Sequence, residues 1–354
     1  MQLVNKQFQI NNGEVVMIKK RILLICTGGT IASTWKKDGY APGLSDSDIL
    51  DYIPSVLEFC DVDTIQVCNI DSTNMTPGHW SLVTKKIKEN YDIYDGFVIL
   101  HGTDTMAYTA AALSYMIQNS NKPIVLTGSQ KPICLEITDA KTNLIDSIRY
   151  ACSDSSSGVQ IVFNHSVIAG TRGKKTHAHS YAAFSSVNFP ELASIREDKI
   201  FRYITPIKYE KEVEFIEEFH DSIAVLKLIP GIKPEMLEFL FKYYDCLVIE
   251  GFGVGGIPET LKDEFYKQMN HWISAGKLAV IATQVVNEGS NMEVYEVGLK
   301  VKKDFNLIEA YDMTLEATVT KLMYLMTKYG KDYKSIREGF YQPINYDIAK
   351  PEIG

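Results

Sequence analysis

The sequence predicts an α/β protein with two doubly wound domains, a larger N-terminal one and a smaller C-terminal one, each built on a mostly parallel sheet. Short apolar runs rich in Ile, Val and Leu alternate with segments of helical spacing, as buried parallel strands alternate with crossover helices. Several of these runs stop abruptly at glycine-rich or polar turns. The length of 354 residues also exceeds what a single hydrophobic core usually supports, so two domains are expected.

The N-terminal domain is expected over residues 18–205, after an extension of residues 1–17. Thr76 and Pro77 are residue types favoured at the N-cap and at the first helical position, so they predict where one helix begins. The strands of this domain are predicted at 21–27, 64–70, 96–100, 123–127 and 159–164, and its helices at 77–90, 105–118 and 139–151.

The C-terminal domain is expected over residues 222–354, after a linker at 206–221. Residues 208–221 are charged and contain no glycine, which predicts a solvated connector. Asp312 is the predicted N-cap of the last long helix. The strands of this domain are predicted at 222–228, 245–250 and 277–282, and its helices near 234–243, 258–274 and 312–328.

Composition and charge argue against several classes of protein. Hydrophobic residues make up 45% of the chain and charged residues 23%, the balance of an ordinary soluble globular protein. No run approaches the roughly 20 apolar residues that span a bilayer, and the polar start does not resemble a secretory signal. The net charge of −8 comes without a visible basic stripe. We therefore expect neither a membrane nor a nucleic acid as partner.

The cysteines and histidines give no pattern of a metal site. Six cysteines lie mostly within apolar runs and form no CxxC pair, which predicts reduced, buried thiols and a cytoplasmic location. His177 and His179 share one face of a predicted strand, but no Cys or carboxylate partner accompanies them. No metal is expected.

A glycine pattern in the second half of the chain suggests a dinucleotide, but its surroundings do not. GFGVGG at 251–256 follows a predicted strand and satisfies G-x-G-x-x-G. Pro258 comes almost at once, however, and the next predicted strand leads to Gln284 instead of the acidic residue that binds a ribose. We expect no nucleotide cofactor.

Thr30 and Thr103 each lie in a glycine-rich turn that ends an apolar run. One interpretation makes each an N-cap or a turn residue, positions for which Thr is well suited. The other makes them a hydroxyl nucleophile and its partner. The turn HGTD favours the second interpretation, because Asp104 at a helix start stays ionised and can hold a substrate ammonium. The turns TGGT, DSTNM, HGTDT and TGSQ all follow predicted strands, so they are expected at one ligand-binding edge.

A threonine hydroxyl becomes a good nucleophile only when a base takes its proton. Lys174 and Lys175 lie in the glycine-flanked segment AGTRGKKTHAHS, after the strand predicted at 159–164. Desolvation in a pocket can lower the pKa of a lysine enough for it to act as that base. The alternative is that both lysines are solvated surface charges. The residues alone leave both interpretations open.

Six segments in this order resemble the bacterial L-asparaginases, and in particular their cytoplasmic type I branch: TGGTIAS, DSTNMTP, YDGFVILHGTDTMAYTA, TGSQKP, TDAKTNL and DMTLEAT. The resemblance extends from about Lys19 to the end of the chain. It implies hydrolysis of L-asparagine to L-aspartate and ammonia through a threonine-bound aspartyl ester. It also implies a homotetramer made of two close dimers, without a metal or an organic cofactor.

The resemblance further implies the role of each site residue. Thr30 matches the nucleophile, and Tyr40 matches a lid residue that touches it. A second triad corresponds to Thr103, Asp104 and Lys175, with Asp104 as the charge partner of the substrate ammonium. Substrate binding is assigned to Gly29, Asp71, Ser72, Thr73, Gly102, Thr103, Asp104 and Ser129.

The chain departs from the family pattern at two places. Gly256 stands where some members have an Asn that reaches a neighbouring subunit's site, so the partner's contribution is in doubt. Some cytoplasmic members bind asparagine at an effector site through a Thr, an Arg and a Cys. The corresponding residues here are Lys174, Glu250 and Val285, so we predict that this effector site is absent or altered.

Two other functions compete with asparagine hydrolysis. The ammonia-releasing amidase subunit of a tRNA-dependent amidotransferase resembles the same family, although such subunits carry an extra domain before TGGT. A non-catalytic amino-acid sensor would keep the pocket without turnover. Thr30, Thr103, Asp104 and Lys175 are all present, so nothing in the sequence favours that loss.

Overall fold

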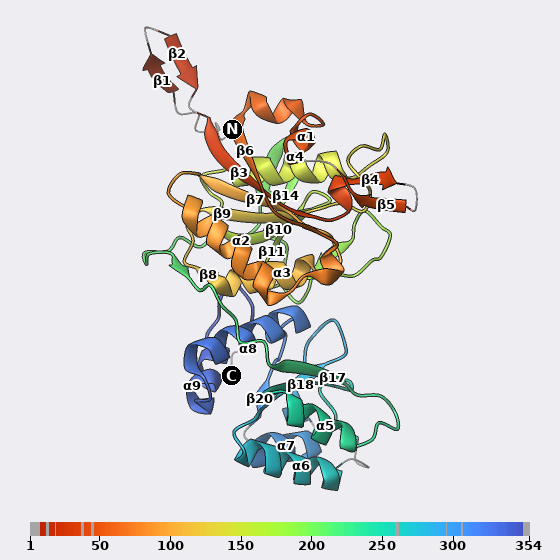
Figure 1. Cartoon of the computed structure of the whole chain (residues 1–354). Helices are drawn as coiled ribbons and strands as arrows, with labels where there is room; N and C mark the ends of the chain where they lie inside the picture. The colour runs from red at the N-terminus through yellow and green to blue at the C-terminus, as the bar shows by residue number, and fades with distance from the viewer. Residues whose placement is uncertain are drawn as a thin grey trace.

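The computed structural model describes residues 8–11, 14–17, 19–36, 39–43, 46–258, 262–294, 296–305 and 307–349. They form two α/β units, which Figure 1 shows one above the other. The larger unit is built on an eight-stranded sheet and the smaller one on a four-stranded sheet. The predicted fold class, two α/β domains with mostly parallel sheets, is thereby confirmed.

The large sheet has the strand order β15-β14-β11-β10-β9-β7-β3-β6. The five strands from β10 to β6 pair in parallel, and β11, β14 and β15 extend the sheet with antiparallel pairs. All five strands predicted for this domain are present, whereas the antiparallel strands were not predicted. The strands are β3 (Lys20–Gly28), β6 (Cys60–Ile70), β7 (Gly96–Leu100), β9 (Pro123–Thr127), β10 (Gly158–Phe163), β11 (Ser166–Ala169), β14 (Ala193–Arg196) and β15 (Lys199–Arg202).

Helices cover both faces of this sheet because its central strands are apolar on both sides. Along β3, Leu23 and Ile25 pack into one apolar cluster with α2 and α3, and Ile22 and Leu24 pack into another with α4. The period of two in a strand produces this alternation. The helices are α1 (Asp46–Leu50), α2 (Pro77–Asn90), α3 (Met106–Met116) and α4 (Ala140–Ala151).

Four short strand pairs accompany the large sheet. They join β1 (Phe8–Asn11) to β2 (Glu14–Met17), β4 (Ser33–Lys36) to β5 (Gly39–Pro42), β12 (Gly173–Lys175) to β13 (Phe184–Ser186), and β8 (Ile117–Gln118) to β16 (Glu214–Phe215). All four pairs are antiparallel. The first pair falls within the predicted extension.

The smaller sheet, β17-β18-β19-β20, is parallel throughout. One of its faces packs with α5, α6 and α7, and the other shares an apolar cluster with α8, α9 and α3 of the first domain. The elements are β17 (Ile223–Lys227), α5 (Glu235–Tyr243), β18 (Cys246–Gly251), α6 (Lys262–Ser274), β19 (Leu278–Thr283), α7 (Glu296–Phe305), β20 (Ile308–Glu309), α8 (Leu315–Tyr329) and α9 (Tyr333–Phe340).

Two local predictions were wrong. Helix α8 begins at Leu315, and its N-cap is Thr314, whose side chain accepts from the backbone N–H of Ala317. Asp312 pairs instead with Arg172 of the first domain, a partner that no local capping rule could reveal.

The segment 208–221 is also more than a solvated connector. Phe215 lies in β16, and its ring meets that of Tyr91 edge to face with centroids 5.4 Å apart. Phe219 meets Trp80 in the same way at 6.3 Å. The many charges of this segment concealed the apolar side chains that fasten it to the core.

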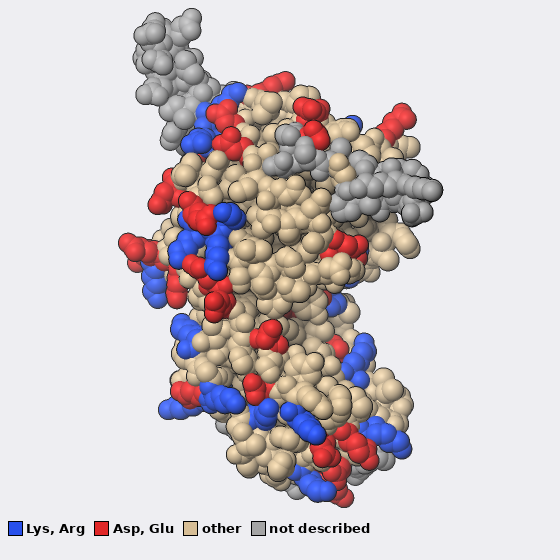
Figure 2. All heavy atoms as spheres, viewed as in Figure 1, with Lys and Arg blue, Asp and Glu red and all other residues tan. Residues whose placement is uncertain are grey.

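The surface and the helix lengths agree with a globular chain. Figure 2 shows basic and acidic side chains interspersed on the face in view. Among the residues that the structure describes, no helix is long and apolar enough to cross a membrane.

Helix α8 joins the two domains around a buried charge pair. The ring of Tyr115 on α3 stacks on Tyr324 of α8, with centroids 6.1 Å apart. Lys321 of α8 contacts the Asp347 carboxylate at 2.6 Å, and both side chains are fully buried. Asp347 also accepts from the Tyr115 hydroxyl at 2.9 Å. The C-terminal tail, α8 and α3 therefore share one polar contact inside the core.

We expect Lys321→Met to lower the free energy of unfolding by about 3–5 kcal/mol, because Asp347 would remain buried without its cation. Adding Asp347→Asn removes the orphaned charge, so the double variant should regain a large part of the loss. Urea unfolding of the native chain and the two variants measures both differences. Equal stability of the single and double variants would contradict this account of the pair.

Candidate active site

The polar turns singled out in the sequence lie at one edge of the large sheet. TGGT spans the end of β3, the DST turn follows β6, HGTD follows β7, and TGSQ begins at the last residue of β9. The strand order β9-β7-β3-β6 makes the four strands neighbours, and their parallel direction brings all four turns to the carboxyl edge. This is the edge at which doubly wound sheets bind ligands.

Three of these turns pack so closely that only glycine fits between them. A Cβ on Gly29 would lie 2.5 Å from the backbone nitrogen of Gly102, and Gly29 has a φ of 86°. A Cβ on Gly102 would in turn lie 2.6 Å from the Ser72 hydroxyl oxygen. Both distances are far below van der Waals contact. The two glycines predicted to bind substrate therefore also allow TGGT, HGTD and DST to meet.

Neither threonine caps a helix. Thr30 is half-buried and begins the short 3₁₀ helix Thr30–Ala32, whose N-cap is Gly29. Thr103 is buried and precedes α3, whose N-cap is Thr105. The capping interpretation is therefore wrong for both residues. Thr103 does lie in a turn, as the same interpretation allowed. In the part of the chain that the structure describes, neither hydroxyl is used for capping, so each is available to another partner.

Lys175 provides such a partner for Thr103. Its ammonium donates to the Thr103 hydroxyl at 2.8 Å and to the Asp104 carboxylate at 2.6 Å. The Lys175 side chain is only 18% exposed, so the interpretation as a solvated surface charge is wrong for it. Lys174 is not a free surface charge either, because it pairs with Glu316. Thr103, Asp104 and Lys175 thus come together across 72 positions of sequence.

The fourth turn contributes a residue that the sequence analysis did not select. The Thr103 hydroxyl lies 3.4 Å from the side-chain oxygen of Gln130 in TGSQ. The carboxylate of Asp139 accepts from the Gln130 backbone N–H at 2.9 Å and fixes this turn. Ser129, predicted to bind substrate, is buried, and its hydroxyl donates to the Lys131 carbonyl oxygen. Gln130 is therefore the side chain of TGSQ that reaches Thr103.

The DST turn is ordered by its own carboxylate. Asp71 accepts from the backbone N–H of Thr73 at 2.9 Å and from its hydroxyl at 2.8 Å. These two hydrogen bonds lower the pKa of Asp71. Ser72 is buried and links the turn to HGTD, since its hydroxyl accepts from the Asp104 backbone N–H at 3.3 Å. Asp71 and Thr73 are exposed at the mouth of this edge.

Tyr40 lies in β5, which pairs with β4 so that Tyr40 is opposite Trp35. The side chain of Tyr40 lies outside the described part of the structure. Its assignment as a lid residue that touches Thr30 therefore stays a prediction.

The ring of His101, the first residue of HGTD, is buried, neutral and hydrogen-bonded on both nitrogens. Trp80 donates to the Thr109 hydroxyl at 2.9 Å, and this hydroxyl lies 2.8 Å from Nε2 of His101. Nδ1 of His101 lies 2.7 Å from the Gly102 carbonyl oxygen. A carbonyl oxygen only accepts, so Nδ1 carries the proton and Nε2 accepts from Thr109. Complete burial lowers the pKa of His101 to about 4, which keeps the ring neutral.

The other patterns weighed in the sequence lie elsewhere. His177 and His179 are exposed and outside any strand, and the described residues contain no cluster of three potential metal ligands. The GFGVGG turn folds back through a bridge between Phe252 and Gly256. None of the six cysteines, all of which the structure describes, forms a disulfide, and Cys134 is exposed, contrary to the expectation of buried thiols.

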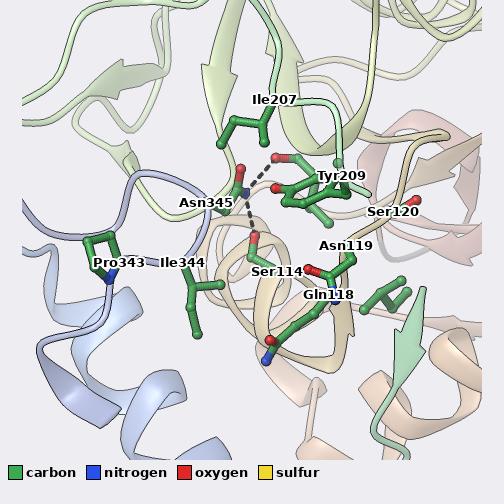
Figure 3. A pocket seen from close by; sticks show the side chains of 12 residues that line it. Ser114, Gln118, Asn119, Ser120, Ile207, Tyr209, Pro343, Ile344 and Asn345 are labelled. Atoms are coloured by element: carbon green, nitrogen blue, oxygen red, sulfur yellow. Dashed lines mark hydrogen bonds between the residues drawn. The ribbon is translucent and has the colours of Figure 1, made fainter. Parts of the chain in front are cut away.

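One cavity among the described residues lies away from this edge. It measures about 170 Å³, and none of the residues that line it is charged. Figure 3 shows Asn345 in this cavity, with its amide donating to Ser114 and to the carbonyl oxygen of Val159. Gly158, another lining residue, is the first residue of β10. The cavity therefore lies at the amino ends of the strands, opposite the four turns.

Comparison with known families matches both domains. A family model described as "Asparaginase, N-terminal" matches residues 21–208. A second one, described as "Glutaminase/Asparaginase C-terminal domain", matches residues 222–340. The two matches correspond to the two α/β units of the structure.

Individual relatives cover most of the chain. L-asparaginase of Thermococcus kodakarensis is 36% identical over 319 residues, which are 90% of this chain and 96% of the relative. L-asparaginase 1 of Escherichia coli K12 is 34% identical, over 94% of this chain and 99% of the relative. A glutamyl-tRNA(Gln) amidotransferase subunit of Methanosphaera stadtmanae is 34% identical, over 86% of this chain and 72% of the relative.

Solved structures share the fold. The thermostable L-asparaginase of Thermococcus kodakarensis superposes with a TM-score of 0.86 at 34% identity, covering 93% of this chain and 99% of that one. A probable cytoplasmic L-asparaginase of Campylobacter jejuni gives 0.78 at 27% identity, covering 91% of this chain and 99% of that one.

The contact between Gly102 and Ser72 predicts a strong effect of one methyl group. We expect Gly102→Ala to lower the free energy of unfolding by about 1–3 kcal/mol, because the new Cβ must push two turns apart. Gly78→Ala is the matched control, since a Cβ there meets only Thr76 at 3.7 Å. Chemical unfolding of both variants measures the difference. A Gly102→Ala protein as stable as the control would contradict the proposed close packing.

The buried His101 predicts a loss of stability in mild acid. Below its ordinary pKa of 6.5 the unfolded chain binds a proton that the folded chain, with a pKa of about 4, does not. Stability should therefore fall as the pH drops from 6.5 to 4, and this group should account for about 2 kcal/mol at pH 5. Unfolding at pH 7 and pH 5 should show a smaller difference in His101→Gln, but not in the exposed control His177→Gln. An unchanged pH dependence in His101→Gln would refute this explanation.

Proposed function

This chain belongs to the L-asparaginase family, in its type I branch, and from that membership we propose that it hydrolyses L-asparagine to L-aspartate and ammonia through an ester on Thr30. The observation that carries the proposal is the double contact of the Lys175 ammonium with Thr103 and Asp104. A hydroxyl, an ammonium and a carboxylate in direct contact can bind a zwitterionic amino acid and move protons beside it. The Thr30 turn packs against the same HGTD turn.

The reaction proceeds in two steps. The Thr30 hydroxyl oxygen attacks the side-chain amide carbon of asparagine, and a bond forms while the hydroxyl proton is taken up. The carbon–nitrogen bond then breaks, and the nitrogen leaves with that proton as ammonia. In the second step water attacks the aspartyl ester and restores the Thr30 hydroxyl. For this transfer Lys175 acts as the neutral amine: Thr103 takes up the proton of Thr30 while its own hydroxyl proton passes to the Lys175 nitrogen, to which it is hydrogen-bonded. The protonated Lys175 then gives this proton to the leaving nitrogen, and in the second step the same two groups move a proton from water to the Thr30 oxygen.

Backbone groups supply the stabilisation of the intermediate. Attack on the amide converts its carbonyl oxygen to an oxyanion, which is best stabilised by fixed N–H donors. Between described residues, no hydrogen bond uses the backbone N–H of Thr30 or of Thr103. Both lie in turns held rigid by the contact between Gly29 and Gly102. These two N–H groups are our candidates for the oxyanion hole.

The substrate's charged ends are bound at the exposed part of the edge. Asp104 is 55% exposed on its side chain, so a substrate ammonium can reach it from solvent. Asp71, Ser72 and Thr73 follow β6, which is separated from β7 by β3, and Ser72 contacts the backbone of Asp104. We assign the binding of the α-carboxylate and α-amino groups to these three residues. Gly29, Gly102 and Ser129, the other residues that we assign to substrate binding, belong to the turns at this edge. The reaction as written needs neither a metal ion nor an organic cofactor.

We also propose a cytoplasmic homotetramer. None of the six cysteines, all of which the structure describes, forms a disulfide, as is usual in a reducing compartment, and the Campylobacter neighbour is described as cytoplasmic. The tetramer is the assembly that the family resemblance implies. Gly256 has no side chain, so this position cannot supply the amide with which some family members reach a neighbouring subunit's site.

A second candidate follows from the amidotransferase relative. The Methanosphaera stadtmanae protein is about as similar in sequence as the asparaginases are, but the chain covers 72% of it against 96% and 99% of theirs. An amidase of that kind would release ammonia for use on a charged tRNA. Glutamine hydrolysis stimulated by charged tRNA would support this alternative over the asparaginase.

Thr30→Ala should reduce ammonia release from asparagine by about 10³-fold or more, because no ester can form without the hydroxyl. Thr138→Ala is the matched control, since its half-buried hydroxyl bonds to the backbone of Lys131 and Ala140 and to no side chain assigned to the site. Steady-state kcat/KM for asparagine and for glutamine measures the effect.

The same variant separates an enzyme from a sensor. Calorimetry should show that Thr30→Ala still binds L-aspartate, since the groups that hold its charged ends are unchanged. If the native protein binds aspartate but releases no ammonia from either amide, it is a sensor and the proposal is wrong. If Thr30→Ala keeps native activity, the nucleophile is wrongly assigned.

A further inference from the structure

Lys174 and Lys175 are neighbours in β12 but have partners in different domains. Lys175 contacts Thr103 and Asp104 at the carboxyl edge of the large sheet. Lys174 donates to both oxygens of the Glu316 carboxylate, at 3.0 and 3.2 Å. Glu316 lies in the first turn of α8, within the C-terminal domain. Consecutive strand residues point to opposite sides, so each contact restricts the other.

We propose that Glu316 is a positioning residue that, by holding Lys174, keeps the Lys175 ammonium in place against Thr103 and Asp104. This inference rests on the proposed function, because it concerns the lysine that moves protons in that reaction. Strand β12 is three residues long, and among the described residues it pairs with the equally short β13. Backbone hydrogen bonds of Val187 to Arg172 and of Thr176 to Ala183 extend this pairing by one residue at each end. Backbone pairing alone therefore gives the lysine little support. The ion pair from the second domain supplies the missing constraint.

Other contacts fasten the residues just before β12 to the same domain. The Thr314 hydroxyl donates to the Thr171 carbonyl oxygen at 3.0 Å. Arg172, which is fully buried, donates to the Asp312 carbonyl oxygen at 2.9 Å and pairs with its carboxylate at the same distance. Residues 312–316 therefore hold the chain at three points just before Lys175. Among these contacts, only that of Glu316 involves Lys174, the strand residue directly before Lys175.

The surroundings of Glu316 make Lys174 hard to replace as its partner. Glu316 is 7% exposed, and Glu250 near the end of β18 lies close enough to feel the charge of its carboxylate. Burial and the Glu316 charge raise the pKa of Glu250, whereas Lys227 and Lys174 lower it. Burial and both carboxylates likewise raise the pKa of Tyr108 on α3. Lys174 is the cation hydrogen-bonded to Glu316 in this partly buried acidic group between the domains, where loss of one partner is costly.

The experiment compares Glu316→Gln with Glu309→Gln in the full chain. Glu309 is the matched control, because it is fully buried and pairs with Lys302 at 2.6 Å within the C-terminal domain. Both variants lose the acidic partner of a largely buried ion pair, and both should be less stable in urea unfolding. Only Glu316→Gln should lose kcat, by about tenfold or more, with KM changed less than about twofold, since misplacement of a proton-carrying group slows chemistry more than binding.

A charge exchange tests the pair itself. The double variant Lys174→Glu with Glu316→Lys should recover most of the kcat lost in either single variant, because the ion pair is rebuilt with opposite polarity. It also keeps the test decisive if Glu316→Gln fails to fold. A carbon-13 NMR signal of reductively methylated Lys175, assigned with Lys175→Arg, should move in Glu316→Gln and stay in place in Glu309→Gln.

Three outcomes would overturn the positioning role: a kcat in Glu316→Gln equal to that of Glu309→Gln, an unmoved Lys175 signal, or a charge exchange that restores stability but not kcat. Failure of the proposed function looks different, because the native protein would then release no ammonia from asparagine. In that case the NMR comparison still reports whether Glu316 positions Lys175.

Discussion

The close approach of three turns through two glycines is the constraint on which the candidate site depends. Gly29 meets the backbone at Gly102, and Gly102 meets Ser72, at distances that exclude any side chain. Each turn belongs to a different strand, so their contact fixes the position of the strand ends relative to one another. Hydroxyl and carboxylate groups can then converge without a long loop to carry them. The parallel order of the strands provides the edge, and the glycines close it.

The second domain completes what this edge cannot supply alone. The N-terminal sheet presents Thr30 and Thr103, but the lysine between the turns comes from a three-residue strand beyond the sheet. Residues 312–316 and the tail near Asn345 hold the chain that leads to it, since the Thr171 hydroxyl donates to the Asn345 carbonyl oxygen at 2.6 Å. Helix α8 serves both purposes, because one part packs in the shared core and its first turn contacts β12. A rigid contact between the domains is therefore part of the site.

Features that depend on neighbouring residues could be predicted from the sequence, whereas contacts between distant segments could not. Strand positions and the turns carrying Thr30 and Thr103 follow from local apolar runs and glycines, and these predictions were confirmed. Lys175 could be linked to Thr103 only by family resemblance, because composition does not reveal contacts between distant segments. Asp312 shows the same limit, because its partner also comes from a distant segment. Local rules made it a helix cap, but it pairs with Arg172 across the domain boundary. The hydrogen bonds by which Trp80 and Thr109 support HGTD could not be predicted, because a Trp and a Thr within two helices are not unusual and carry no recognisable pattern.

The charges of the site are separated by depth, and this separation has a consequence for how the protein responds to pH. Below the edge, burial keeps His101 neutral, and its hydrogen bonds to Thr109 and Gly102 satisfy both ring nitrogens. Above it, the ammonium of Lys175 and the carboxylate of Asp104 are paired where solvent and substrate can reach them. Protons that enter the lower layer act on stability, whereas protons exchanged in the upper layer act on the reaction. Acid can therefore weaken the support of HGTD through His101, a buried group that does not contact Lys175 or Asp104. The neutral, hydrogen-bonded ring of His101 helps to fix the HGTD turn, and this turn fixes Thr103 and Asp104 at the sheet edge.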